Sequence, residues 1–232
     1  MRKFFAFMVT FMIAMVLVAC GGDDEDKKKE ETAQEANQEV EISEEEKVDQ
    51  DEVVVEINGT EVKGEKYNAI YPQTKMQMHQ FGEDADDLDA VKENTLDELI
   101  AQELLIQEAD KHGVKVSKDR AKEEMETAKS ENEEQFNAYL EEFQLTEEMF
   151  TDQIWLGLLV EKYMDEELQI DEVTNDEIQE TYDELKKESE ELPDFDELKE
   201  DLKKQLETQK KAEKLEAKLE KLKEDATIEK KI

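Results

Sequence analysis

The folded part of this chain opens with a hairpin signal, Val53-Val54-Val55-Glu56-Ile57-Asn58-Gly59-Thr60-Glu61-Val62. Valine and isoleucine are typical of strands. The Asn-Gly pair between two apolar runs favours a tight two-residue turn. We therefore expect a small β-hairpin here. Near the far end of the chain, Thr227-Ile228-Glu229 predicts a short strand that pairs with 53–57 and closes the domain.

Between these two strands, apolar residues recur at helical spacing. The first predicted helix runs from Glu65 to Phe81, and Pro72 inside it should kink it. The second runs from Leu88 to His112, where Gly113 supplies a C-terminal stop.

Capping residues predict the starts of the later helices. These residues are Ser117, Asn132, Thr146, Thr174 and Asp194. The stretch 154–160 is apolar nearly all round, which predicts a helix buried on several sides. With 7 Gly and 2 Pro, the chain lacks the turns of a sandwich or barrel. The sequence therefore predicts a mainly α domain over 53–232, with a small β-hairpin and a long C-terminal helix that returns to it.

The first 19 residues have the pattern of an export signal. Arg2 and Lys3 precede an apolar run of 16 residues, 4–19, which is short for a membrane span of roughly 20 residues. The run ends in Leu17-Val18-Ala19-Cys20, which resembles the lipobox of bacterial lipoproteins. That resemblance implies that the Cys20 thiol takes a diacylglycerol group and that Cys20 becomes the new N-terminus. The alternative is a membrane-spanning anchor followed by an idle cysteine.

Residues 20–52 are predicted to form a lipidated, acidic, disordered tether. From 21 to 52 the chain has 15 Asp and Glu, four Lys and no aromatic residue. Such a composition buries too little apolar surface to offset the entropy of ordering. The same segment is either a spacer of defined reach or a linker of no required length.

The charge of the whole chain restricts its partners. The sequence has 67 acidic and 30 basic residues, for a net charge of −37. Phosphate would be repelled, so we exclude nucleic acid as a partner. Attachment to an anionic membrane by charge is equally disfavoured, and the predicted lipid takes that role.

The order of these segments resembles the N-terminal chaperone domain of the SurA and PrsA class of exported folding factors. The matching segments are 55–62, the helix at Tyr67, 99–109, 113–117, 136–145, 173–182 and 195–228. The resemblance implies that the protein binds unfolded or partly folded exported proteins without ATP or a cofactor. It also implies a lipid-anchored location outside the cytoplasm, on the outer leaflet of a Gram-positive cell membrane.

The resemblance does not extend to the prolyl-isomerase domain of the family. That parvulin domain sits where this chain has only Asp183–Asp194, which contains no histidine and no glycine. The two histidines, His79 and His112, are predicted to be partly exposed residues near helix ends, and no metal site is expected. The resemblance therefore implies client binding and not isomerase activity.

Candidate client contacts are Met76, Met78 and Phe81, because methionine makes an adaptable apolar surface. Met78 and Phe81 lie on the apolar stripe of their helix, so core packing is the favoured alternative for them. Met76 lies off the stripe, and both interpretations stay open for it. Trp155 is expected in the core.

Three functional hypotheses follow. The first is a membrane-tethered holdase that cradles clients between the helical lobe and the long C-terminal helix. The second is a scaffold lipoprotein that binds one native partner. The third is a degenerate isomerase. The sequence leaves open which clients are bound and whether the protein forms a homodimer.

Overall fold

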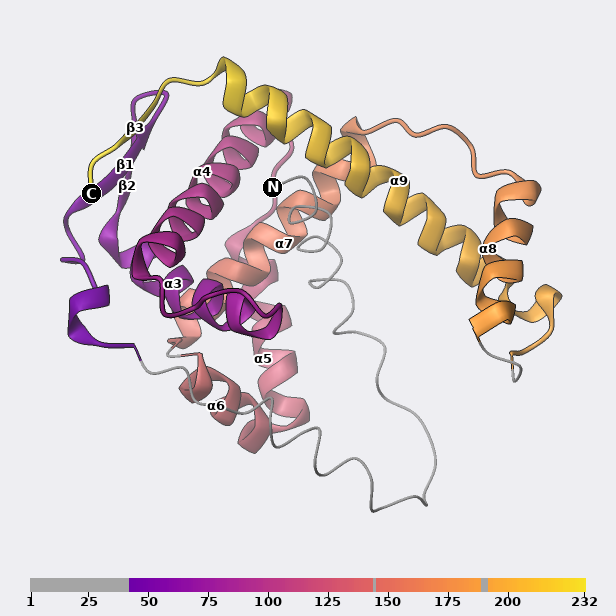
Figure 1. The fold of residues 1–232 in the computed structure, drawn as a ribbon, viewed down its shortest axis with the longest axis horizontal. Coiled ribbons are helices and arrows are strands. Elements are labelled where there is room, and N and C mark those ends of the chain that lie inside the picture. The colour runs from indigo at the N-terminus through magenta and orange to yellow at the C-terminus, as the bar shows by residue number, and fades with distance from the viewer. Residues whose placement is uncertain (1–41, 144, 189–191) are drawn as a thin grey trace. The chain divides into compact units, whose positions relative to one another are not determined.

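The computed structural model describes residues 42–143, 145–188 and 192–232 (Figure 1). The predicted signal, Cys20 and most of the predicted tether lie outside these residues. The described part is mainly helical, with one small sheet, which confirms the predicted fold class. Its elements are η1 (Glu44–Glu46), β1 (Val53–Ile57), β2 (Thr60–Lys63), α3 (Gly64–Gln80), α4 (Leu88–His112), α5 (Lys118–Glu131), α6 (Glu133–Glu142), α7 (Glu147–Glu167), α8 (Asn175–Glu188), α9 (Phe195–Asp225) and β3 (Ile228–Lys230).

The region predicted as one domain contains two compact units. The first, which we call the sheet unit, comprises the described residues up to Val160 together with Leu222–Ile232. The second, the α8–α9 unit, comprises Glu161–Lys221. The boundaries between them fall inside α7 and near the end of α9.

The predicted hairpin is formed by β1 and β2. These antiparallel strands pair Ile57 with Thr60, and Asn58 and Gly59 take positive φ angles of 53° and 85°. Both positive angles are the signature of a type I′ turn, which matches the right-handed twist of paired strands. Asparagine and glycine tolerate this conformation better than other residues do.

The predicted strand near the C-terminus is also present. β3 pairs antiparallel with β1, opposite β2, so that β1 is the central strand of the order β2-β1-β3 (Figure 1). Asn58 reinforces this closure, because its side-chain oxygen accepts a hydrogen bond from the Thr227 N–H at 3.0 Å. The other end of the same amide donates to Gln107 Oε1 on α4 at 2.9 Å. One turn residue thus joins the hairpin, α4 and the C-terminal strand.

The largest core of the sheet unit lies between the sheet, α3 and α4. Val54, Val55 and Ile57 of β1 are fully buried and belong to one cluster with Tyr71 of α3 and Leu96 of α4. α3 continues through Pro72 to Gln80. α4 has the predicted bounds and ends at Gly113, whose φ of 76° is left-handed as expected for a C-terminal stop.

The predicted caps of α5, α6 and α7 are confirmed. Ser117, Asn132 and Thr146 each accept a hydrogen bond from the backbone N–H three residues later. The aromatic side chains of α6 and α7 pack edge to face, with the Phe136 and Phe150 ring centroids 5.5 Å apart.

The apolar stretch of α7 is less buried than predicted. Within 154–160, Leu156 and Leu159 are buried and the other residues are partly exposed. Trp155, which was expected in the core, is one of the partly exposed residues. Its indole N–H donates to the Val116 carbonyl at 3.0 Å, and Lys118 lies over its ring.

The α8–α9 unit has its own small core, formed by Val173, Ile178, Tyr182 and Leu202. The predicted capping box of α8 is present, with the Glu177 carboxylate accepting from the Thr174 backbone N–H at 2.8 Å. Glu177 also pairs with Lys210 of α9 at 2.7 Å, so α8 is fixed to α9 by charge as well as by apolar contact.

None of the helices in the described ranges combines the length and apolar character that crossing a bilayer requires.

We predict that Asn58→Gly destabilises the sheet unit by about 1–3 kcal/mol, because it removes two hydrogen bonds worth about 0.5–1.5 kcal/mol each while keeping the positive φ. Urea unfolding followed by the fluorescence of Trp155, the chain's single tryptophan, measures the change. Glu61→Gln on the exposed face of β2 is the control and should shift stability by less than about 0.5 kcal/mol. Equal stability of the two variants would contradict the role of Asn58.

Candidate functional site

The structure separates the three predicted client contacts. Met78 is buried, with 3% of its surface exposed, and its sulfur accepts a hydrogen bond from Asn94 at 3.2 Å. Met78 therefore packs in the core, which was the favoured alternative for it. Its burial argues against direct contact with a client. Met76 is partly exposed, and Phe81 is 46% exposed. For Met76 and Phe81, client contact stays a prediction.

Phe81 leaves the core because α3 ends one residue earlier than predicted. It is the C-cap of the helix, with φ −88° and ψ 6°, so the helical stripe no longer directs its ring inward. Leu88, the first residue of α4, is 42% exposed and was not predicted as a site residue. Within the described ranges, these two are the exposed large hydrophobic side chains. They stand at the two ends of the loop between α3 and α4, which we call the 81–88 loop.

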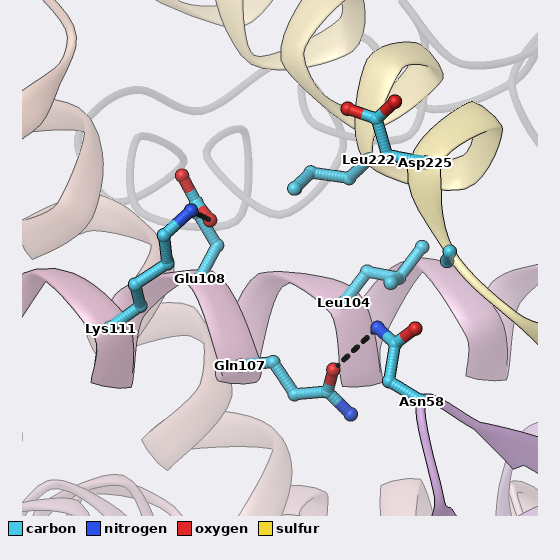
Figure 2. A pocket seen from close by; sticks show the side chains of 8 residues that line it. Asn58, Leu104, Gln107, Glu108, Lys111, Leu222 and Asp225 are labelled. Atoms are coloured by element: carbon cyan, nitrogen blue, oxygen red, sulfur yellow. Dashed lines mark hydrogen bonds and ion pairs between the residues drawn. The ribbon is translucent and has the colours of Figure 1, made fainter.

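A hollow of about 180 Å³ lies in the sheet unit beside the hairpin turn (Figure 2). Three residues form its apolar lining. Leu104 belongs to α4, Leu222 lies in the last turn of α9, and Ala226 directly follows α9. Polar side chains also line it, and these are Asn58, Gln107, Glu108, Lys111 and Asp225. Figure 2 shows Gln107 and Asn58 joined by their hydrogen bond at one side.

The charged groups of this hollow are largely engaged with one another. The Glu108 side chain is only 3% exposed, and its two oxygens lie 3.3 Å from Lys111 Nζ and 3.1 Å from His112 Nε2. His112 is the last residue of α4, and 35% of its side chain is exposed, as expected for a helix-terminal histidine. His79 lies on α3 and is exposed. The described residues contain no cluster of three or more His, Cys, Asp or Glu side chains that could hold a metal ion. The buried carboxylate of Glu108 thus already has basic neighbours at this hollow.

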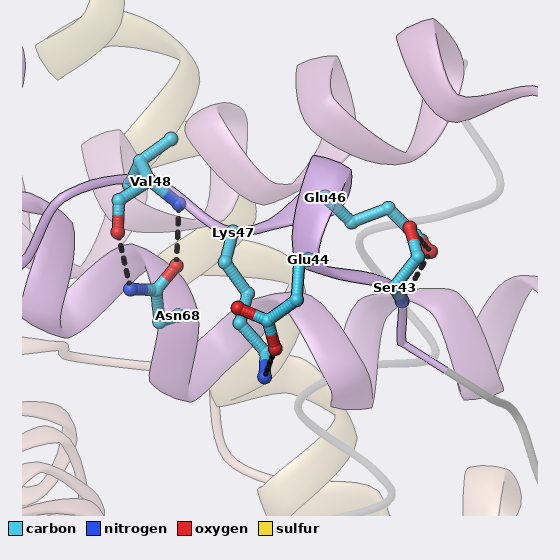
Figure 3. A network of polar contacts seen from close by, with 6 residues as sticks. All are labelled: Ser43, Glu44, Glu46, Lys47, Val48 and Asn68. Atoms are coloured by element: carbon cyan, nitrogen blue, oxygen red, sulfur yellow. Dashed lines mark hydrogen bonds and ion pairs between the residues drawn. The ribbon is translucent and has the colours of Figure 1, made fainter.

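Residues 42–52 form a third feature, which we call the N-terminal arm. The sequence places them in the tether, but the structure packs them against α3. The Val48 N–H and carbonyl bond to the Asn68 side chain at 3.0 and 2.8 Å (Figure 3). Gly64 comes so close to the arm that a Cβ there would lie 2.0 Å from the Asp49 carbonyl oxygen. Only glycine fits this contact.

A buried ion pair completes the attachment of the arm. Glu46 Oε2 lies 2.6 Å from Lys75 Nζ, and the two side chains are only 4% and 9% exposed. Burial alone would raise the pKa of the Glu46 carboxyl. Hydrogen bonds from Lys75, from the backbone and hydroxyl of Ser43 and from Tyr71 outweigh it and lower the pKa to about 2. Burial and the nearby Glu46 carboxylate raise the pKa of Tyr71 in turn.

The sequence did not reveal this pair, because its members are 29 residues apart and Glu46 stands among many similar acids. A signal was nonetheless present. Lys75 is a lysine on the otherwise buried side of a helix whose neighbours, Thr74 and Met78, face the core. Lysine is almost never fully buried without a partner.

Comparison with known proteins defines the class. Residues 1–164 match the model of the SurA-like N-terminal domain, which is more than half of the chain. The chain therefore belongs to the SurA-like N-terminal domain family.

A curated relative narrows the comparison. The chain is 32% identical over 150 residues to the foldase protein PrsA of Caldanaerobacter subterraneus subsp. tengcongensis. The aligned part covers 60% of this chain and 44% of that protein, so the match spans less than half of the relative. No solved structure gives a significant match. The predicted resemblance to the SurA and PrsA class is thus confirmed.

We predict that Glu46→Gln destabilises the sheet unit by about 3–5 kcal/mol at pH 7, because it leaves the Lys75 charge buried without its counter-charge. The difference from the unmodified chain should shrink as pH falls from about 4.5 to about 2, since the pKa of Glu46 is about 2 when folded and near 4.5 when unfolded. Its stabilising charge is complete above that window and is lost below it. Urea unfolding at several pH values measures both effects.

Glu44→Gln is the matched control for the arm. It removes a carboxylate whose side chain is 88% exposed and which pairs with Lys47 at 2.8 Å. An exposed pair of this kind contributes about 0–1 kcal/mol. Similar losses for the two variants would show that the arm does not depend on the buried pair.

Proposed function

We propose that this protein is a lipid-anchored chaperone outside the cytoplasm, which holds non-native exported polypeptides without ATP. The observation that carries the proposal is the exposure of Phe81 and Leu88 within the part of the chain that matches a chaperone domain. Exposed apolar side chains can take up apolar segments of unfolded clients. The net charge of −37 keeps such a protein soluble while it presents them.

The proposal assigns no prolyl-isomerase activity to the residues described. α8 ends at Glu188 and α9 begins at Phe195, which is where the resemblance would place the isomerase domain. His79 and His112 belong to different helices, and His112 is engaged with Glu108.

The anchoring part of the proposal rests on Cys20. The lipobox-like Leu17-Val18-Ala19-Cys20 supports acylation of that thiol after removal of residues 1–19. Two acyl chains hold a protein on a bilayer stably, whereas a single chain does so only marginally. The acidic residues beyond Cys20 would then keep the folded part away from an anionic surface.

A scaffold lipoprotein with one native partner is the second candidate. Among the described residues, the exposed large hydrophobics gather at a single loop, which suits one defined partner better than a broad client surface. The number of different clients that bind therefore separates the two candidates.

We predict that the chain from residue 20 onward, carrying Cys20→Ser so that it stays unlipidated, suppresses aggregation of several unrelated, chemically unfolded proteins at near-stoichiometric ratio. Light scattering measures suppression, and an inert protein of similar negative charge is the control. Suppression should persist in about 1 M NaCl, where the screening length is about 3 Å, because apolar contact is not screened. If the aggregation of none of these proteins is suppressed, the protein is not a general chaperone, and the scaffold with one native partner becomes the leading candidate.

We predict that Cys20→Ser in the full-length chain abolishes lipid attachment, because a hydroxyl cannot replace the thiolate nucleophile. Intact mass and detergent-phase partitioning of the protein expressed in a Gram-positive host measure the result. The unmodified chain should lose residues 1–19 and gain a diacylglycerol mass. Thr10→Ser within the apolar run is the control and should be processed normally. Membrane retention of both variants with an intact N-terminus would indicate a spanning anchor instead.

A further inference from the structure

The 81–88 loop presents its two apolar side chains in a fixed conformation. The Glu83 N–H bonds to the Met78 carbonyl at 2.9 Å, and Gly82 takes a left-handed φ of 70°. Ala85 in the middle of the loop is buried in the main core of the sheet unit. The exposure of Phe81 and Leu88 is therefore a feature of the folded loop. Because the loop is already ordered, binding a ligand would cost little conformational entropy of the loop.

The same loop has an uninterrupted negative charge. Glu83, Asp84, Asp86 and Asp87 lie between the two apolar residues, and Asp89 follows Leu88. The sequence has no Lys or Arg from 80 to 91.

The hydrogen bonds of these carboxylates do not cancel their charge. The Asp84 side chain accepts from the Asp86 N–H at 3.1 Å, and that of Asp87 accepts from the Ala90 N–H at 3.2 Å. A backbone amide donates a hydrogen bond but brings no net positive charge. The loop thus combines two exposed apolar side chains with an acidic rim.

This combination decides between possible occupants. An anionic membrane surface, a nucleic acid and a second copy of this chain with its charge of −37 would each bring negative charge to an acidic rim. A polypeptide segment with apolar side chains next to Lys or Arg complements both features.

We propose that the 81–88 loop selects client segments in which apolar or aromatic side chains alternate with Lys or Arg. This inference rests on the proposed function as a holdase and names its substrate class. Apolar contact with Phe81 and Leu88 supplies the affinity. The carboxylates of the rim supply the preference for cationic over anionic segments.

The test uses the chain from residue 20 onward with Cys20→Ser and three labelled, unfolded peptides of equal length and apolar content. The peptides differ only in having Lys, Ser or Glu at the polar positions. At low ionic strength, fluorescence anisotropy should show about five- to tenfold tighter binding of the Lys peptide than of the Glu peptide, as expected for a few exposed ion pairs. In about 1 M NaCl the preference should approach unity while the Ser peptide still binds.

Two variants locate the site. Phe81→Ser with Leu88→Ser should weaken binding of all three peptides by about tenfold or more, because the apolar contact area is lost. Asp86→Asn with Asp89→Asn should reduce the preference for the Lys peptide to about twofold and leave binding of the Ser peptide intact. The control is Glu133→Gln with Glu134→Gln, which removes the same amount of charge from the exposed start of α6. It should change neither the affinity for the Ser peptide nor the preference for the Lys peptide by more than about twofold.

The outcomes separate this inference from the proposed function. Equal binding of the Lys and Glu peptides would overturn the charge selection. Unchanged peptide binding by the Phe81/Leu88 variant, with aggregation suppression intact, would overturn the site and leave the holdase standing. A change of mass in solution on substituting Phe81 and Leu88 would show that a second copy covers the loop, which also overturns the inference. Failure of the unmodified chain both to bind peptides and to suppress aggregation would overturn the proposed function itself. Circular dichroism checks that every variant is folded.

Discussion

The central position of β1 is the constraint on which the sheet unit depends. This strand pairs with β2 on one side and β3 on the other, and it buries Val54, Val55 and Ile57 against α3 and α4. A hairpin of two strands alone is marginally stable in water. The third strand and the helices below it make the hairpin a fixed part of the fold. Its turn then holds Asn58 where it reaches both Gln107 and Thr227.

Several basic residues of this acidic chain join one element to another. Lys230 of β3 contacts Glu93 and Asp97 of α4, Lys118 of α5 contacts Asp152 of α7, and Lys75 of α3 contacts Glu46 of the N-terminal arm. Positive charge is therefore used where acidic elements meet, where repulsion would otherwise be largest. The sequence itself has no Lys or Arg from 80 to 91, the stretch that contains the 81–88 loop.

Local signals made much of the fold predictable. Asn58-Gly59 defined the hairpin, and Gly113 and Ser117 defined the end of one helix and the start of the next, because each acts through backbone geometry close to itself. The closing strand was predicted from the residues Thr227-Ile228-Glu229 themselves, and its pairing with 53–57 is confirmed. The family resemblance followed from the order of these pieces.

Long-range contacts were not predictable in the same way. The arm looked like a tether because its composition is acidic. Its contacts with α3, among them the hydrogen bonds between Val48 and Asn68 and the buried pair of Glu46 and Lys75, show that residues 42–52 belong to the folded part. Phe81 lay on the apolar stripe of a predicted helix, but that helix ends at Gln80 and Phe81 is 46% exposed. Leu88 gave no signal, since an apolar residue at the start of a helix ordinarily faces inward.

The pairing of β1 with β3 also sets an order of events in folding. Asn58 and Thr227, which are hydrogen-bonded to each other, are 169 residues apart. A chain that emerges N-terminus first makes β1 and β2 available long before β3, and contacts of such separation form slowly. Until residues 228–230 arrive, one edge of β1 is open to pairing with any other extended chain. The dense negative charge of the early segments opposes association between copies during that interval.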